Sequence, residues 1–104
     1  MIIVTSEEVT GKTIKQSLGM VRGSTIRSRW LGRDIMAGLK TLVGGEIKSY
    51  TDMMNKARDE AQARMEEEAK KLGADAIVAV RFSTANVMQG AAEILAYGTA
   101  VRLR

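Results

Sequence analysis

A single apolar stripe of helical period does most to limit the folds open to this chain. Between Thr51 and Leu72, apolar residues recur every three or four positions, at Met54, Ala57, Ala61, Met65, Ala69 and Leu72. This spacing places them on one face of an α-helix, while acidic residues four positions before basic ones follow the other face. We therefore predict a helix over Thr51–Leu72, with Ser49 or Thr51 capping its start and Gly73 closing its end.

Strand patterns flank this helix on both sides. Short strands are expected at Ile2–Val4 and around Val9, and longer ones within Thr13–Arg29, Ala76–Ser83 and Ile94–Leu103. Gly19 and Gly23 fall inside the Thr13–Arg29 segment, where they mark bends or bulges. A shorter helical pattern over Leu31–Leu42 ends at Gly44–Gly45.

The order of these elements predicts an α+β fold, with one long and one short helix on one face of a mainly antiparallel sheet. The length of 104 residues predicts one domain, 1–104. In the last strand Ala96, Gly98 and Ala100 share a face, and such small side chains allow the long helix or a neighbouring subunit to approach closely. Only four residues are aromatic, so the core is thin, and we expect a second copy of the chain to complete it.

The composition limits the catalytic and metal-binding groups that the chain can use. The chain has no cysteine and no histidine, which removes thiolate chemistry, the commonest general base and the commonest metal ligand. The N-terminus lacks the features of a signal peptide, and no apolar run is long enough to cross a membrane. We expect a cytoplasmic protein that does not bind membranes.

The net charge is +4, and the excess positive charge lies in the first half of the chain. Arg22, Arg27, Arg29 and Arg33 form its densest group, with glycines beside them. Because a guanidinium binds carboxylates and oxyanions through two parallel hydrogen bonds, this group is a candidate anion site. The alternative is a set of salt bridges between subunits. Specific nucleic-acid binding is not expected, since aromatic platforms and reading motifs are missing.

Carboxylates are the remaining candidates for a site. Glu46 and Glu93 could bind a metal ion through oxygen, with Asp34 and Asp75 as further ligands, although no pair has a recognised metal-binding spacing. A buried Glu93 could also act as an acid–base catalyst. The alternative is that Glu93 pairs with Arg81 or with the arginine group.

Three blocks of the sequence carry a resemblance. They are VRGSTIRSRWLGRDIMAGLKTLVGGEI (residues 21–47), LGADAIVAVRF (72–82) and GAAEILAYGTAV (90–101). In this order they resemble the YbjQ family of heavy-metal-binding domains, over about Val4 to Arg102. The resemblance implies a dodecin-like α+β subunit that assembles into a homopentameric ring.

These observations lead to three hypotheses about function. The first is a non-catalytic, cytoplasmic, homo-oligomeric protein that binds a small ligand, either an anion or a metal ion held by oxygen ligands. The second is a structural or adaptor oligomer whose ring presents a protein-binding surface. The third is an enzyme of the hydrolase type that uses a buried glutamate.

Overall fold

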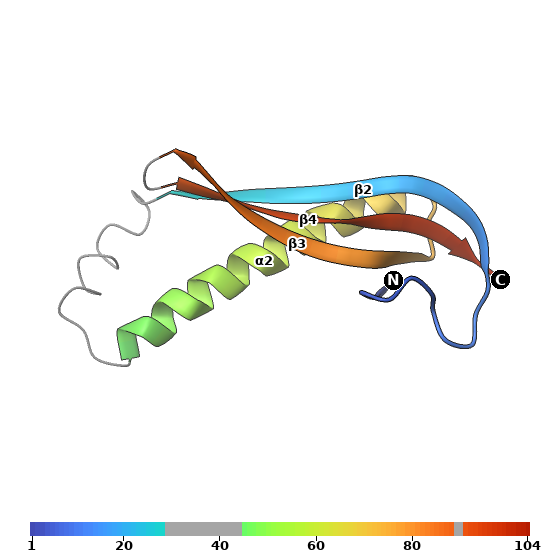
Figure 1. Cartoon of the computed structure of the whole chain (residues 1–104), viewed down its shortest axis with the longest axis horizontal. Helices are drawn as coiled ribbons and strands as arrows, with labels where there is room; N and C mark the ends of the chain where they lie inside the picture. Colours follow the sequence, from blue (N-terminus) through green and yellow to red (C-terminus); the bar gives the residue numbers. More distant parts are fainter. Residues whose placement is uncertain (29–44, 89–90) are drawn as a thin grey trace.

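The computed structural model describes residues 1–28, 45–88 and 91–104, which form four strands and one long helix (Figure 1). In chain order they are β1 (Ile2–Ile3), β2 (Ile14–Ser28), α2 (Gly45–Lys71), β3 (Ala76–Met88) and β4 (Ala91–Leu103). The predicted α+β class is confirmed. The short helix predicted over Leu31–Leu42 lies outside the described residues.

The strands form one sheet in the order β1-β3-β4-β2. β4 pairs antiparallel with β2 on one side and with β3 on the other, whereas β1 runs parallel to β3. The mainly antiparallel sheet is therefore confirmed. The strand predicted around Val9 is wrong, because the Val9 carbonyl instead accepts a turn hydrogen bond of 3.0 Å from the Lys12 amide.

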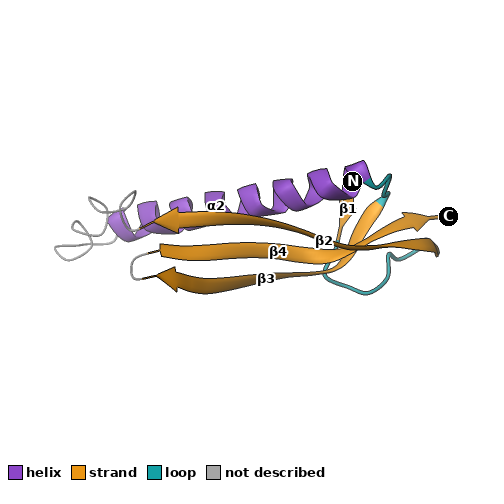
Figure 2. Ribbon diagram, turned by 90° about the horizontal axis from the view of Figure 1, so that it is seen from above, coloured by secondary structure: helices purple, strands orange, loops and turns teal. Residues whose placement is uncertain are grey.

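The helix α2 lies along one face of the sheet, over β2 and β4 (Figure 2). Its apolar stripe is buried as predicted from Ala57 to Ala69, with Ala57, Ala61, Met65 and Ala69 fully inaccessible. Leu72, predicted on the same face, lies past the end of the helix and is 44% exposed. The predicted start at Thr51 is wrong, since the helix begins at Gly45. Ile47 lies two helical turns before Met54, so the apolar period continues back through both residues proposed as caps.

The end of α2 agrees with prediction. Gly73 adopts a left-handed φ of 77°. Its amide donates to the Lys70 carbonyl at 3.0 Å, and the Ala74 amide donates to the Ala69 carbonyl at 3.1 Å. This pair of bonds is the Schellman motif, which satisfies carbonyls that the last helical turn leaves free.

The two glycines of β2 have different roles. Gly19 has a φ of 108° and adjoins a shift in the β2–β4 register, so the predicted bulge is confirmed there. The bulge predicted at Gly23 is wrong, because the register passes through this residue without a break. Gly23 is instead the point of closest approach to α2, where a Cβ atom would overlap the backbone of Ala61 and Met65.

The small-residue face of β4 lies towards the helix. Ala96 and Ala100 are fully buried in the cluster that contains Met65, Ile77 and Ile94. The structure therefore places the long helix, which was one of the two predicted occupants, against this face.

The opposite face of the sheet is covered only in part by described residues. Val4 and Val9 from the N-terminal segment pack on Val78 and Val101 at one end. Beyond them, Met20 is 68% exposed and Ile26 is 57% exposed. We call this remaining area the open face, and it comprises Met20, Arg22, Ser24 and Ile26 of β2, Glu93, Leu95 and Tyr97 of β4, and Arg81, Ser83 and Ala85 of β3.

Candidate anion-binding site

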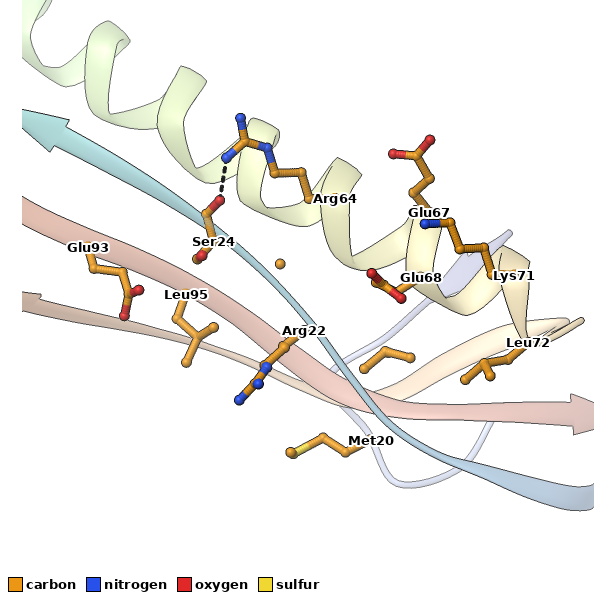
Figure 3. Close-up of a pocket in the computed structure, with 12 residues that line it drawn as sticks. Met20, Arg22, Ser24, Arg64, Glu67, Glu68, Lys71, Leu72, Glu93 and Leu95 are labelled. Carbon is orange, nitrogen blue, oxygen red and sulfur yellow. Dashed lines mark hydrogen bonds between the residues drawn. The ribbon is translucent and has the colours of Figure 1, made fainter.

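A hollow of about 1050 Å³ lies along the outer edge of β2 (Figure 3). α2 lines it with Arg64, Glu67, Glu68 and Lys71, and the sheet lines it with residues that include Arg22, Glu93 and Leu95. Figure 3 shows the helix residues on one side of the β2 ribbon and these three sheet residues on the other. The hollow therefore wraps around the edge of the sheet, and charged side chains border it on both sides.

Arg22 is the predicted anion ligand that the structure describes in full. Its side chain is exposed, and it makes no hydrogen bond or ion pair with any described residue. Arg64, by contrast, has a hydrogen-bond partner in the fold, since its Nη1 donates to the Ser24 carbonyl at 2.5 Å. An arginine without a protein partner keeps all five N–H donors available for a ligand.

The strand register gives Arg22 neighbours that sequence reasoning missed. Arg22 lies directly opposite Tyr97 of β4, and Tyr97 lies directly opposite Arg81 of β3. Directly opposite residues on adjacent strands share a face and have Cβ atoms about 5 Å apart. Two arginines thus flank one tyrosine on the open face. No short motif could have revealed this, because the three residues are far apart in the sequence and meet only through pairing.

Glu93 is half-buried in the middle of the sheet, opposite Ile26 of β2 and Ala85 of β3. Within the described residues Arg81 does not pair with Glu93, since its Nη1 donates to the carbonyls of Thr5 and Val80, each at 2.8 Å; a pairing of Glu93 with an arginine across a subunit interface stays a prediction. Glu93 is four residues along β4 from Tyr97, a separation of about 13 Å at the usual rise of a strand. Arg22 and Glu93 therefore border the same hollow without being brought together.

The other predicted site residues are only partly described. Arg27 lies in β2 opposite Ala92, and Glu46 lies in the first turn of α2; the side chains of both are outside the described residues. Arg29 and Arg33 lie outside them entirely. The proposed grouping of Arg27, Arg29 and Arg33 with Arg22 therefore stays a prediction.

The donor atoms of this chain do not suit a thiophilic heavy metal. Such metals prefer thiolate and imidazole ligands, and the sequence contains neither cysteine nor histidine. Across residues 1–28, 45–88 and 91–104, no three acidic side chains come together as a metal-binding group. Asp75 has a structural role, since its Oδ2 accepts a hydrogen bond of 2.8 Å from the Leu103 amide. We therefore derive no chemistry through a metal ion.

In the described part of the chain, no helix is both long and apolar enough to cross a bilayer.

Comparison with known proteins places the chain in a family. A family model described as "Putative heavy-metal-binding" matches residues 1–104. A UPF0145 protein of Thermus thermophilus is 59% identical over 99% of this chain and 90% of its own length. One from Archaeoglobus fulgidus is 59% identical over 100% of this chain and 96% of its own.

A solved structure supports the fold. A protein of unknown function from Pediococcus pentosaceus, assigned to the DUF74 family, superposes with a TM-score of 0.65 over 100% of this chain and 98% of its own. At 22% sequence identity, this likeness shows the fold alone. The full-length family match and the identity to the UPF0145 relatives show that the chain belongs to the YbjQ family.

Proposed function

We propose that this protein is a non-catalytic, homo-oligomeric binding protein for a small anion. The observation that carries the proposal is Arg22, an exposed guanidinium on the open face with no partner among the described residues. The chain as a whole has a net charge of +4, which favours anions over cations at long range. We also propose that it works in the cytoplasm, because a cysteine-free composition suits a reducing compartment.

Two strand edges that no described strand fully covers support self-assembly. β2 is the last strand of the sheet, and no described strand pairs with its outer side. On the opposite edge, backbone bonds from Val4 and Ser6 cover β3 as far as Val80, and no described strand pairs beyond that point. Unpaired edges of this length are templates for pairing with another chain. Two different edges on one subunit allow head-to-tail association, which closes into a ring when the rotation permits.

The homopentameric, dodecin-like ring implied by family resemblance is part of this proposal. In such a ring each copy contributes its own Arg22. A single guanidinium per chain then becomes a repeated set of positive charges around one axis, which strengthens the attraction for anions.

The second candidate function is an adaptor that presents a protein-binding surface. It is favoured by the exposed apolar side chains Met20 and Ile26 on the open face. A third proposal is a metal ion held by the carboxylate oxygens of Glu46 and Glu93. Oxygen ligands of this kind suit only hard cations.

The test compares two variants that each remove one positive charge. Arg22→Gln removes the proposed ligand, whereas Arg104→Gln removes an exposed arginine at the C-terminus. Isothermal titration with inorganic phosphate and sedimentation velocity are run on both variants and on the wild type. We expect phosphate binding to be lost in Arg22→Gln alone, with assembly unchanged in both. Equal binding by the wild type and Arg22→Gln would refute the anion site, and a monomeric wild type would refute the oligomer.

A further inference from the structure

The open face carries a regular arrangement of polar and apolar side chains around Tyr97. In one row across the three strands, Arg22, Tyr97 and Arg81 lie side by side. In the adjacent row, Ser24, Leu95 and Ser83 do the same. The central strand therefore provides an apolar floor of Tyr97 and Leu95. The two flanking strands each provide one arginine and one serine.

The two arginines are held differently. Arg81 is fixed through its Nη1, which donates to the Thr5 and Val80 carbonyls, while its other N–H groups bond to no described residue. Arg22 has no such anchor among the described residues. The Cα atoms of the two lie two strand spacings apart, about 10 Å, so the long Arg22 side chain can extend over Tyr97 towards Arg81. The Arg81 guanidinium is thus held in place, whereas no described residue restrains the Arg22 side chain from closing on a ligand.

The floor decides what kind of anion fits. A tyrosine ring and a leucine favour a flat apolar body, which stacks on the ring and covers the leucine. Guanidinium groups and serine hydroxyls on both flanks donate to an anionic head. The N-terminal segment bounds the floor beyond Arg81, because the Thr5 carbonyl lies within hydrogen-bond distance of that guanidinium. Glu93 lies about 13 Å from Tyr97 along β4, and its carboxylate disfavours negative charge at the end of the ligand away from the anionic head.

We propose that the open face binds a planar organic anion, an aromatic body that bears a carboxylate, sulfonate or phosphate group. The head lies between Arg22 and Arg81, and the body lies on Tyr97 and Leu95. This inference rests on the proposed anion-binding function and specifies its ligand class.

Three probes separate the contributions of head and body. The aromatic sulfonate 1-anilinonaphthalene-8-sulfonate has both features, its neutral analogue N-phenyl-1-naphthylamine has the body alone, and inorganic phosphate has the charge alone. Fluorescence titration follows the first two, and calorimetry follows phosphate. We expect the sulfonate to bind about tenfold more tightly than either of the others, with one site per chain.

Matched variants locate the site. Arg22→Gln and Tyr97→Thr should each weaken sulfonate binding about tenfold, as expected for loss of a charge-assisted pair or of a stacking surface. Tyr97→Phe keeps the ring and should bind as the wild type does, and Arg104→Gln controls for net charge. Circular dichroism and sedimentation velocity establish that each variant is folded and assembled.

Each outcome decides between the two proposals. If the sulfonate binds no more tightly than the neutral probe, its anionic group makes no favourable contact with the arginines. That result overturns the proposal of a planar organic anion on the open face. If phosphate binding depends on Arg22 but the sulfonate gains nothing over phosphate, the anion site stands and the planar ligand does not. If Arg104→Gln weakens binding as much as Arg22→Gln does, attraction is a matter of net charge and the assigned site is wrong.

Discussion

Substitution of Gly23 by alanine tests the contact that fixes α2 on the sheet. A Cβ atom at this position would overlap the backbone of Ala61 and Met65 and lie 2.8 Å from the carbonyl carbon of Arg64. Backbone atoms cannot rotate away as a side chain can, so the helix itself must lift from β2. Met65 and Val21, which are buried at this contact, would lose packing as it does so.

The expected cost follows from the packing. Forcing one methyl group into a tightly packed interior typically costs about 1–3 kcal/mol of folding free energy. Because the atoms in the way belong to the backbone, we expect a cost at the upper end of this range, about 3 kcal/mol. For a domain of this size, each kcal/mol lowers the midpoint of thermal unfolding by about 4 °C, which gives a decrease of roughly 12 °C.

The assay is thermal and urea unfolding followed by circular dichroism at a fixed protomer concentration, because assembly would make stability depend on concentration. Gly11→Ala is the control. Its Cβ would meet no atom within 4 Å, but its φ is 82°, so it should cost only the left-handed penalty of about 1 kcal/mol. A Gly23→Ala protein within about 0.5 kcal/mol of the wild type would show that the proposed contact between β2 and α2 is wrong.

Thr25→Val should stabilise the fold by about 1 kcal/mol in urea unfolding, because the buried Thr25 hydroxyl has no hydrogen-bond partner among the described residues; a loss of stability would show that it has one. Ala79 lies where the β3–β4 register shifts, between Val78 and Arg81, and has a φ of 53°. Ala79→Gly should raise the thermal midpoint by a few degrees, because this φ costs an alanine about 1–2 kcal/mol and the flexibility of glycine offsets only part of the gain; a lower midpoint would count against strain at this residue. Arg27→Ala with Arg33→Ala should weaken phosphate binding in calorimetry and leave sedimentation unchanged if these residues belong to the anion site; loss of assembly would assign them to a subunit interface instead.

The helix and the strands could be predicted because their signals are local. The stripe from Met54 to Ala69 defines a buried face by spacing alone, and Gly73 has the residue type that a Schellman motif requires. The start of α2 was placed too late, since Ser49 and Thr51 are good caps by residue type but lie inside a longer apolar period.

The site could not be predicted in the same way, because it depends on register. Arg22, Tyr97 and Arg81 come together only through the pairing register of three strands, which shifts near Gly19 in β2 and around Ala79 in β3. The role of Gly23 could not be predicted for a related reason. A glycine in a strand can serve a bulge or a close approach, and only the position of α2 distinguishes them.

Native mass spectrometry tests most directly whether the protein assembles and binds an anion through Arg22. The sample is untagged protein, purified without chelator, beside its Arg22→Gln variant. We predict a five-chain complex with excess mass of a bound anion, and the same complex without that mass in the variant. A monomer, or an excess mass that the variant retains in full, would contradict the claim.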